Sequence, residues 1–262
     1  MNTERVSEHI VNWLKNYATN AKVNGFVIGV SGGIDSAVTS TLCAKTGLKL
    51  ICVEMPIHQA ESQVNRALEH INNLKKEFSN VSSIKIDLTS TFEEFKNQVP
   101  VSKSKVVTDL AFANTRARLR MTSLYYLAGI HGLLVAGTGN KVEDFGVGFY
   151  TKYGDGGVDL SPIADLLKSE VYELANYLNV ANSIQNAQPT DGLFGDSRTD
   201  EDQIGASYDE LEWAMRMLES GKTISDFENR ELEVFKIYTR LNTLNQHKML
   251  PIPVCEISDK LK

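Results

Sequence analysis

A six-residue segment, Ser31-Gly32-Gly33-Ile34-Asp35-Ser36, limits what this chain can fold into because of the residues on either side. An apolar run over residues 26–30 precedes it, and residues 37–45 follow with a pattern typical of a helix. A strand, a glycine turn and a helix start direct free N–H groups and the positive end of a helix dipole at one point. The segment therefore predicts an anion site in an α/β fold. A serine-capped turn without a ligand is the alternative.

The side chains of the segment extend this prediction. The hydroxyls of Ser31 and Ser36 add hydrogen-bond donors, and Asp35 can hold a magnesium ion against bound phosphates. The segment lacks the Lys-Ser/Thr ending of a Walker A loop, and the chain has no Gly-x-Gly-x-x-Gly fingerprint. Neither of the two commonest phosphate loops is therefore indicated.

Hydrophobic periodicity gives the order of the elements. We expect strands over residues 25–30, 48–55, 83–88 and 133–137, and helices over 4–20, 60–78, 89–98, 108–130, 168–179, 204–219 and 225–246. Alternating strands and helices predict a doubly wound, mainly parallel sheet flanked by helices, with a helical C-terminal part. We expect one domain over residues 1–262, with the core sheet in 22–168 and a helical portion with a lid in 169–262. Ligands bind at the carboxyl ends of such strands, where residues 31–36 and Thr138 should meet.

Composition excludes several classes of protein. The longest apolar runs fall short of the roughly 20 residues that span a bilayer, and the N-terminus lacks the apolar core of a signal peptide. Three scattered cysteines do not form a disulfide framework, so we expect a cytoplasmic protein without a membrane partner. The net charge of −6 argues against a nucleic-acid partner, and the basic cluster around Arg118 suits a small polyanion better.

Residues 137–157 form a second feature with functional signs. This stretch holds seven of the 18 glycines of the chain, together with aromatic residues that disordered segments usually lack. A long glycine-rich segment inside a compact domain is usually functional, although a mobile surface loop is the alternative. Glu143 follows the fourth expected strand as Asp35 follows the first, so the two carboxylates could share a magnesium ion.

Two motifs carry a resemblance to known families. The segment at 31–36 resembles the pyrophosphate loop of the ATP pyrophosphatases, and the stretches GTGNKVE at 137–143 and GFYTKYGDGGVD at 148–159 resemble the signature of NAD synthetases. The resemblance implies a Rossmann-like fold of the ATP pyrophosphatase type. It also implies amidation of deamido-NAD to NAD with ammonia through an adenylated carboxylate, with release of AMP and pyrophosphate.

The resemblance also implies roles for individual residues. It assigns catalytic roles to Asp35 and Lys168, and a magnesium ion to Asp35 and Glu143. The implied ATP contacts are Gly29, Val30, Ser31, Gly32, Gly33, Ile34, Asp35, Ser36, Thr138, Lys168 and Thr190. The implied contacts with deamido-NAD are Asn114, Arg118, Lys152, Asp155, Asp159, His247 and Lys248.

Alternatives remain for several of these positions. Asn114 and Arg118 share a helix face that could be a solvated basic stripe. The pair His247-Lys248 could simply complement the dipole at a helix end. Residues 186–203 are polar and acidic and are typical of a lid. We expect the acidic residues of that stretch, namely Asp196, Asp200, Glu201 and Asp202, to be solvated rather than catalytic.

The chain departs from many bacterial NAD synthetases at one place. They carry Asp-His where this chain has Gly139-Asn140, which puts any role of that acidic side chain in handling ammonia in doubt here. The Gly-Asn version resembles another branch of the family.

Two rival functions and two further expectations follow. A tRNA-thiolating relative would favour a Cys-x-x-Cys motif and a broad basic surface, neither of which is present. A nucleotide-binding regulatory domain would not need paired metal carboxylates. Because no cysteine lies in a sequence context typical of a glutamine-hydrolysing nucleophile, we expect free ammonia to be the nitrogen donor, unless a separate amidotransferase supplies it.

The resemblance also implies a homodimer, in which the helices at 4–20 and 108–130 could form the interface.

Overall fold

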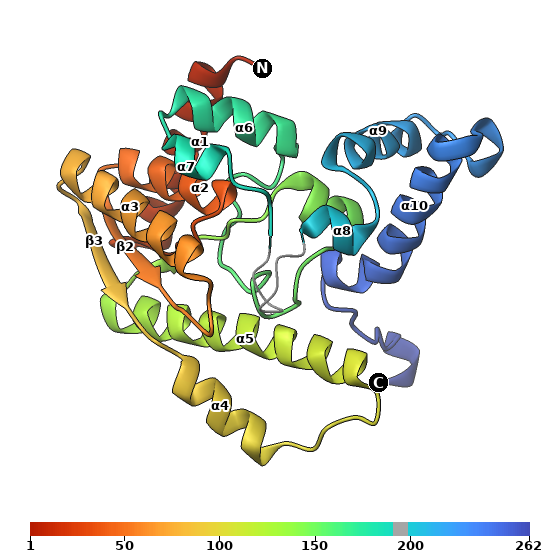
Figure 1. Ribbon diagram of the computed structural model, residues 1–262, viewed down its shortest axis with the longest axis horizontal. Coiled ribbons are helices and arrows are strands. Elements are labelled where there is room, and N and C mark those ends of the chain that lie inside the picture. The colour runs from red at the N-terminus through yellow and green to blue at the C-terminus, as the bar shows by residue number, and fades with distance from the viewer. Residues whose placement is uncertain (191–198) are drawn as a thin grey trace.

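A four-stranded parallel sheet with helices on both faces forms the centre of the protein (Figure 1). The computed structural model describes residues 1–190 and 199–262. The strands are β1 (Gly25–Gly29), β2 (Lys49–Glu54), β3 (Val81–Lys85) and β4 (Leu134–Val135), in the spatial order β3-β2-β1-β4. An isolated parallel bridge between Ala136 and Leu160 extends the β4 edge. The parallel, doubly wound architecture predicted from the sequence is confirmed.

Helices make up most of the remaining described chain. They are α1 (Thr3–Ala21), α2 (Ile34–Lys45), α3 (Glu61–Glu77), α4 (Thr89–Gln98), α5 (Lys105–His131), α6 (Lys168–Tyr177), α7 (Asn182–Gln185), α8 (Asp200–Ile204), α9 (Tyr208–Glu219) and α10 (Asn229–Met249). Three short elements of other types are the π-helix η1 (Val142–Val147) and the 3-10 helices η2 (Ile224–Asp226) and η3 (Asp259–Leu261). Among the described residues, no helix is both long and apolar enough to cross a bilayer.

The strand order creates a switch point beside β1. The chain passes from β1 to β2 and on to β3 in one direction, then returns across the sheet to place β4 on the other side of β1. Helices α2 and α3 make the first two connections, and α4 and α5 make the last. The loops after β1 and β4 therefore diverge at adjacent strand ends, which is where open α/β sheets bind ligands.

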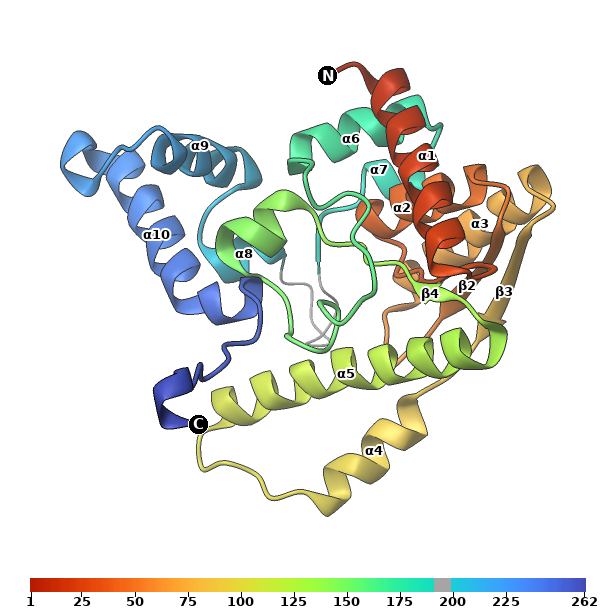
Figure 2. The same ribbon diagram turned by 180° about the vertical axis from the view of Figure 1, so that it is seen from behind.

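The sheet is buried on both faces, as its continuous apolar strands require. Successive residues of β1 alternate between two cores: Phe26 and Ile28 pack with α1, α2, α3 and α6, whereas Val27 packs with α4 and α5. Figure 2 shows α1 and α6 beside α2, with α5 running along the opposite face and α4 outside it. This packing fixes the start of α2 and the middle of α5 relative to the strand ends.

The C-terminal helices form a separate apolar cluster. Residues of η1, α9 and α10 bury Val142, Leu211, Phe235 and Tyr238 against one another. In Figure 1 these helices lie beside the sheet rather than on either face of it. Because η1 belongs to this cluster and also follows β4, it joins the helical part of the molecule to the sheet edge.

Several element boundaries differ from the predictions. Strand β3 begins two residues before the expected Ser83, at Val81, because the register with β2 pairs Leu50 with Val81. The helix expected over 204–219 begins only at Tyr208, since Ile204 belongs to α8, which Gly205 ends in a left-handed conformation with φ of 89°. The helix expected over 225–246 begins at Asn229 and continues to Met249. Among the described residues no strand follows residue 168, as expected.

Candidate active site

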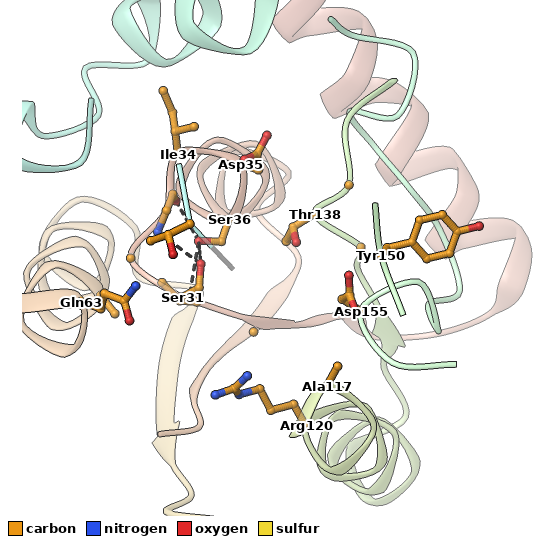
Figure 3. Close-up of a pocket in the computed structure, with 18 of the residues that line it drawn as sticks. Ser31, Ile34, Asp35, Ser36, Gln63, Ala117, Arg120, Thr138, Tyr150 and Asp155 are labelled. Carbon is orange, nitrogen blue, oxygen red and sulfur yellow. Dashed lines mark hydrogen bonds between the residues drawn. The ribbon is translucent and has the colours of Figure 1, made fainter. Parts of the chain in front are cut away.

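A cavity of about 280 Å³ opens at the switch point of the sheet, close to the lower end of the usual volume of small-molecule sites, roughly 300 Å³. Figure 3 shows its walls: the loop with Ser31 and Ser36, Gln63 of α3, Arg120 of α5, and Thr138 after β4. All eight residues from Gly29 to Ser36 line it, as do Thr138, Lys168 and Thr190. The structure therefore brings every predicted ATP-binding residue to one cavity.

The loop between β1 and α2 is held by its own serine hydroxyls (Figure 3). The Ser36 hydroxyl donates to the Gly33 carbonyl at 2.9 Å and accepts from the Ser31 N–H at 3.2 Å. The Ser31 hydroxyl accepts from the Gly33 N–H at 3.2 Å. Among the described residues, no side chain caps the first amides of α2, whose N-cap is Gly33. These amides and the helix dipole are directed toward the cavity, where an anion would complete them.

Gly32 is required by both conformation and space. Its φ is +83°, and a Cβ there would lie 2.6 Å from the backbone oxygen of Gln63 on α3. The Arg66 Nε donates to the Gly32 carbonyl at 3.2 Å and so fixes the loop against α3. A side chain at position 32 would therefore push the loop and α3 apart.

Lys168 joins the two predicted metal carboxylates. Its Nζ donates to Asp35 Oδ2 at 2.6 Å and to Glu143 Oε1 at 3.0 Å. The Lys168 side chain is 3% exposed, against 18% for Asp35 and 16% for Glu143. The three groups come from the starts of α6, α2 and η1, so three separate elements must be in place to assemble them.

Burial and charge act differently on these groups. Burial raises the pKa of the Asp35 carboxyl, and the Lys168 charge offsets this only in part. Burial acts in the same direction on Glu143, but the Lys168 charge and the Tyr208 hydroxyl hold the pKa of that carboxyl below its ordinary value. Burial alone would lower the pKa of the Lys168 amine, whereas the two carboxylates raise it. Lys168 is therefore a cation throughout the physiological pH range.

Tyr208 and Asp200 complete this cluster, and the sequence analysis did not single out either as functional. The Tyr208 hydroxyl donates to Glu143 Oε1 at 2.6 Å, and it lies 3.3 Å from Asp200 Oδ2. Lys168 Nζ lies 4.7 Å from the centre of the Tyr208 ring. The expectation that Asp200 is solvated is wrong, because α8 turns it inward and leaves it 7% exposed. The capping box from Ser207 to Glu210, which starts α9, was the available sequence signal for Tyr208.

The two carboxylates fit a magnesium ion only in part. Asp35 and Glu143 present hard oxygen ligands to the point where Lys168 Nζ lies. Among the described residues, no three His, Cys, Asp or Glu side chains gather closely enough to hold a metal by themselves. The donor set therefore suits an ion whose remaining ligands come from phosphate oxygens and water.

The departure at Gly139-Asn140 has a structural role. Asn140 is fully buried, and its Nδ2 donates to Asp35 Oδ1 at 3.0 Å. Its Oδ1 accepts from the N–H groups of Val142 and Glu143, both at 3.1 Å. Asn140 thus caps the start of η1 and orients Asp35 at the same time, which an imidazole with one donor and one acceptor could not do in the same way.

The predicted dinucleotide contacts gather mostly outside the cavity. Asn114 accepts from Thr151, Arg118 donates twice to the Lys152 carbonyl, and the Lys152 ammonium donates to the His247 carbonyl. Lys248 donates to two carbonyls of the glycine-rich stretch, those of Gly148 and Tyr150. These bonds join α5 and α10 through residues 148–157.

Of the remaining two predicted positions, Asp155 and Asp159, only the first lines the cavity. Asp155 lines the cavity, whereas the Asp159 carboxylate accepts from the Val135 N–H at 2.7 Å and from the Tyr125 hydroxyl at 3.1 Å. Asp159 therefore braces β4 and does not line the main cavity. Residues 191–198 of the predicted lid at 186–203, and with them Asp196, lie outside the described residues.

Arg120 and Gln59 line the cavity and were not predicted to do so. The Arg120 guanidinium donates to the Met55 carbonyl at 3.0 Å and to Gln59 Oε1 at 2.8 Å, and so ties the end of β2 to α5. The sequence pattern had placed Arg120 only in a basic row with Arg116, four residues earlier on the same helix. The loop at residues 55–60 carried no polar pattern that could have predicted this contact.

The fold and the cavity together define a Rossmann-like α/β protein with a glycine loop at a strand-to-helix turn and a lysine between two carboxylates. Comparison with known proteins narrows this class. The model of the NAD synthase family matches residues 6–251, and the chain belongs to that family.

Individual relatives agree with the family assignment. The NH3-dependent NAD+ synthetase of Carboxydothermus hydrogenoformans is 38% identical over 236 residues, which cover 88% of this chain and 92% of that protein. The enzyme of the same name from Methanosarcina acetivorans is 34% identical and covers 98% and 100% of the two chains. A solved structure of NMN synthetase from Francisella tularensis superposes with a TM-score of 0.85 at 31% identity, over 98% of this chain and all of that one.

Proposed function

We propose that this protein is an ammonia-dependent NAD synthetase, which converts deamido-NAD, ATP and ammonia to NAD, AMP and pyrophosphate. One observation carries the proposal: the glycine loop after β1 and the Lys168–Asp35–Glu143 cluster line one cavity in a chain of the NAD synthase family. The names of the relatives at 34–38% identity supply the nitrogen donor.

The chemistry needs positioning rather than an activated nucleophile. The nicotinate carboxylate attacks the α-phosphorus of ATP and expels pyrophosphate, and ammonia then displaces AMP from the acyl adenylate. Because a carboxylate is already ionised near neutral pH, no serine or cysteine has to be activated. The amides at the start of α2 and the Lys168 cation can stabilise charge on the departing pyrophosphate. The enclosed cavity would limit loss of the adenylate to water.

We assign ATP to the residues that line the cavity, and the nicotinate dinucleotide to the polar groups around residues 148–157. The ATP set is Gly29, Val30, Ser31, Gly32, Gly33, Ile34, Asp35, Ser36, Thr138, Lys168 and Thr190. The dinucleotide set is Asn114, Arg118, Lys152, Asp155, Asp159, His247 and Lys248. Lys168 and Asp35 act at the reacting phosphates.

Asp35 and Glu143 would hold a magnesium ion beside the ATP phosphates. When bound, the ion would neutralise phosphate charge in the way that divalent cations do in other phosphate sites. The amide of Asn140 keeps the Asp35 carboxylate in place for this role, with an Nδ2 to Oδ1 distance of 3.0 Å.

Nicotinate mononucleotide is a second candidate for the acceptor. The Francisella tularensis protein named NMN synthetase has a fold similar to that of this chain, with a TM-score of 0.85. Both acceptors present the same nicotinate carboxylate, and they differ in the adenylate half that the residues around 148–157 would contact. Measured acceptor preference therefore decides between the two.

We further propose a cytoplasmic homodimer of a single domain that binds neither nucleic acid nor membrane. Aromatic and aliphatic side chains are exposed on α1 and α5, among them Trp13, Tyr17, Tyr126 and Ile130. Large apolar side chains exposed in this way are typical of protein interfaces. The negative net charge supports the absence of a nucleic-acid partner.

The test is a product assay with purified protein. We expect AMP and pyrophosphate to form in step with the amide product when ATP, ammonium and deamido-NAD are supplied, and more slowly when glutamine replaces ammonium. Parallel reactions with nicotinate mononucleotide give the ratio of kcat/KM for the two acceptors. Release of ADP and phosphate, or no turnover with either acceptor, would contradict the proposal.

A further inference from the structure

A buried carboxylate on α9, that of Glu212, hydrogen-bonds to the first turn of α6. Its Oε1 accepts from the Ser169 N–H at 2.8 Å, and its Oε2 accepts from the Ser169 hydroxyl at 2.8 Å. Glu212 is only 3% exposed. Arg216 also lies near, but its Nη1 is 3.8 Å from Oε2 and its side chain is 54% exposed, so water screens this pair. The two short bonds to Ser169 are therefore what satisfies the buried carboxylate.

The contact supplies a cap that the local sequence of α6 lacks. Helix α6 begins at Lys168, and the residue at its N-cap is Leu167, whose side chain has no hydrogen-bond acceptor. An N-cap side chain normally accepts from the N–H of the second or third helical residue, and Ser169 is the second. Glu212 takes that role from another helix, and its negative charge complements the positive end of the α6 dipole. The start of α6 is therefore held by α9.

Helix α9 contacts both partners of one ion pair in the cavity. Glu212 anchors the backbone beside Lys168. Tyr208, one turn earlier on the same face of α9, donates to Glu143 Oε1 at 2.6 Å. The Lys168 Nζ donates to the same Glu143 oxygen at 3.0 Å. The position of the Lys168 ammonium thus depends on α9, a helix that lies beside the sheet rather than on either face of it (Figure 1).

We propose that Glu212 is a positioning residue, which fixes the first turn of α6 and so holds the Lys168 ammonium in place for the reacting phosphates. The inference rests on the proposed function, in which Lys168 acts at those phosphates. The ammonium sits at the end of a long flexible stem, so its location depends on where the backbone places that stem. A displacement of about 1 Å can cost about a hundredfold in rate. Removal of Glu212 should therefore slow the chemical step more than it weakens binding of deamido-NAD.

Three variants at this contact test the proposal, with kcat measured as pyrophosphate release. Glu212→Ala removes both bonds, and we expect kcat to fall at least about tenfold with the KM for deamido-NAD within about twofold of wild type. Glu212→Gln keeps both contacts, because its amide oxygen can accept from the Ser169 N–H and its amide N–H can donate to the Ser169 hydroxyl. Its kcat should stay within about threefold of wild type. Ser169→Ala removes one bond and should lower kcat about fivefold.

Val234→Ala separates catalytic positioning from the stability of the fold. Val234 is buried in the C-terminal cluster that packs α10 against α9, and this substitution leaves Glu212 and Ser169 unchanged. We expect it to lower the melting temperature as Glu212→Ala does, because both variants leave a defect at a buried site. The kcat per folded molecule, with the folded fraction measured by circular dichroism, should fall in Glu212→Ala but not in Val234→Ala. A merely structural contact would change the melting temperature without changing kcat.

Three results would overturn the inference. One is an unchanged kcat in folded Glu212→Ala. Another is a loss of kcat in Glu212→Gln as large as that in Glu212→Ala, and the third is an equal loss in Val234→Ala. If Glu212→Ala does not fold, an unchanged kcat in Ser169→Ala overturns the inference. If the wild-type protein forms no AMP and pyrophosphate with either nicotinate acceptor, the proposed function fails instead, so the two failures are distinguishable.

Discussion

The carboxylates of Asp35 and Glu143 both form ion pairs with Lys168. Their charges nevertheless contribute differently to the stability of the folded protein. The pKa of Asp35 is raised by burial, so folding does not favour its ionised form. We expect Asp35→Asn to reduce turnover by about a hundredfold or more, because a charge beside the reacting phosphates is lost, with little change in thermal stability. Pyrophosphate release and a melting curve measure the two effects.

Glu143→Gln is the informative comparison. The pKa of Glu143 is held below its ordinary value by Lys168 and Tyr208, despite burial, so folding favours its charge. This variant should lose both activity and melting temperature. Asp165→Asn is a surface control, since the Asp165 side chain is 99% exposed. Normal turnover of Asp35→Asn would refute the assignment of that carboxylate to the reaction.

Gly32 and Gly47 form a matched pair at the scale of the element. Both have positive φ, +83° and +75°, but a Cβ at Gly47 meets nothing within 4 Å, whereas one at Gly32 meets the Gln63 oxygen at 2.6 Å. Gly47→Ala should cost about 1 kcal/mol of unfolding free energy and leave ATP affinity unchanged. Gly32→Ala should cost more and weaken ATP binding at least about tenfold.

Urea unfolding and titration calorimetry measure these two quantities. If the two alanine variants were equally stable and bound ATP equally well, the close contact of the glycine loop with α3 would contribute neither to the unfolding free energy nor to ATP affinity.

His70 links the packing of α2 and α3 to pH. Burial lowers the pKa of His70 to about 4 from 6.5, and its Nε2 lies 2.8 Å from the Ser40 hydroxyl. Between these values the unfolded chain binds a proton that the folded protein does not. The contribution of His70 to the unfolding free energy is therefore fully present above about pH 6.5. It decreases by up to about 3 kcal/mol as the pH falls toward 4.

Unfolding experiments at pH 4.5 and 7 measure this contribution. The slope with pH should become shallower in His70→Gln and stay the same in His9→Gln, because His9 is exposed. An identical slope in all three proteins would show that His70 does not contribute.

The sequence predicted the parallel sheet and the glycine turn between β1 and α2 well, for physical reasons. Apolar strands such as residues 26–30 must be buried on both faces, and a serine-glycine turn before a helix has few other uses. It did not predict the inward turn of Asp200 or the contact of Glu212 with Ser169, because these depend on how α8 and α9 pack. A π-helix has no simple hydrophobic period, and Asp159 proved to brace β4 through contacts that are distant in sequence.

Association is a prediction at the scale of the whole molecule. The exposed apolar side chains of α1 and α5, such as Trp13 and Tyr126, are expected to be covered by a second copy. Sedimentation equilibrium should give a mass near twice the 29.1 kDa of one chain. Tyr126→Glu, which places a charge on this surface, should shift the protein toward the monomer. A monomeric wild-type protein would contradict the prediction.

The central claim is that this cavity adenylates a carboxylate, and oxygen labelling tests it most directly. Deamido-NAD that carries ¹⁸O in its nicotinate carboxylate is converted with ATP and ammonium, and the products are analysed by mass spectrometry. If the carboxylate attacks the α-phosphorus and ammonia then cleaves the C–O bond, one ¹⁸O atom must appear in AMP. Label in inorganic phosphate with formation of ADP, or AMP that carries no label, would contradict the account.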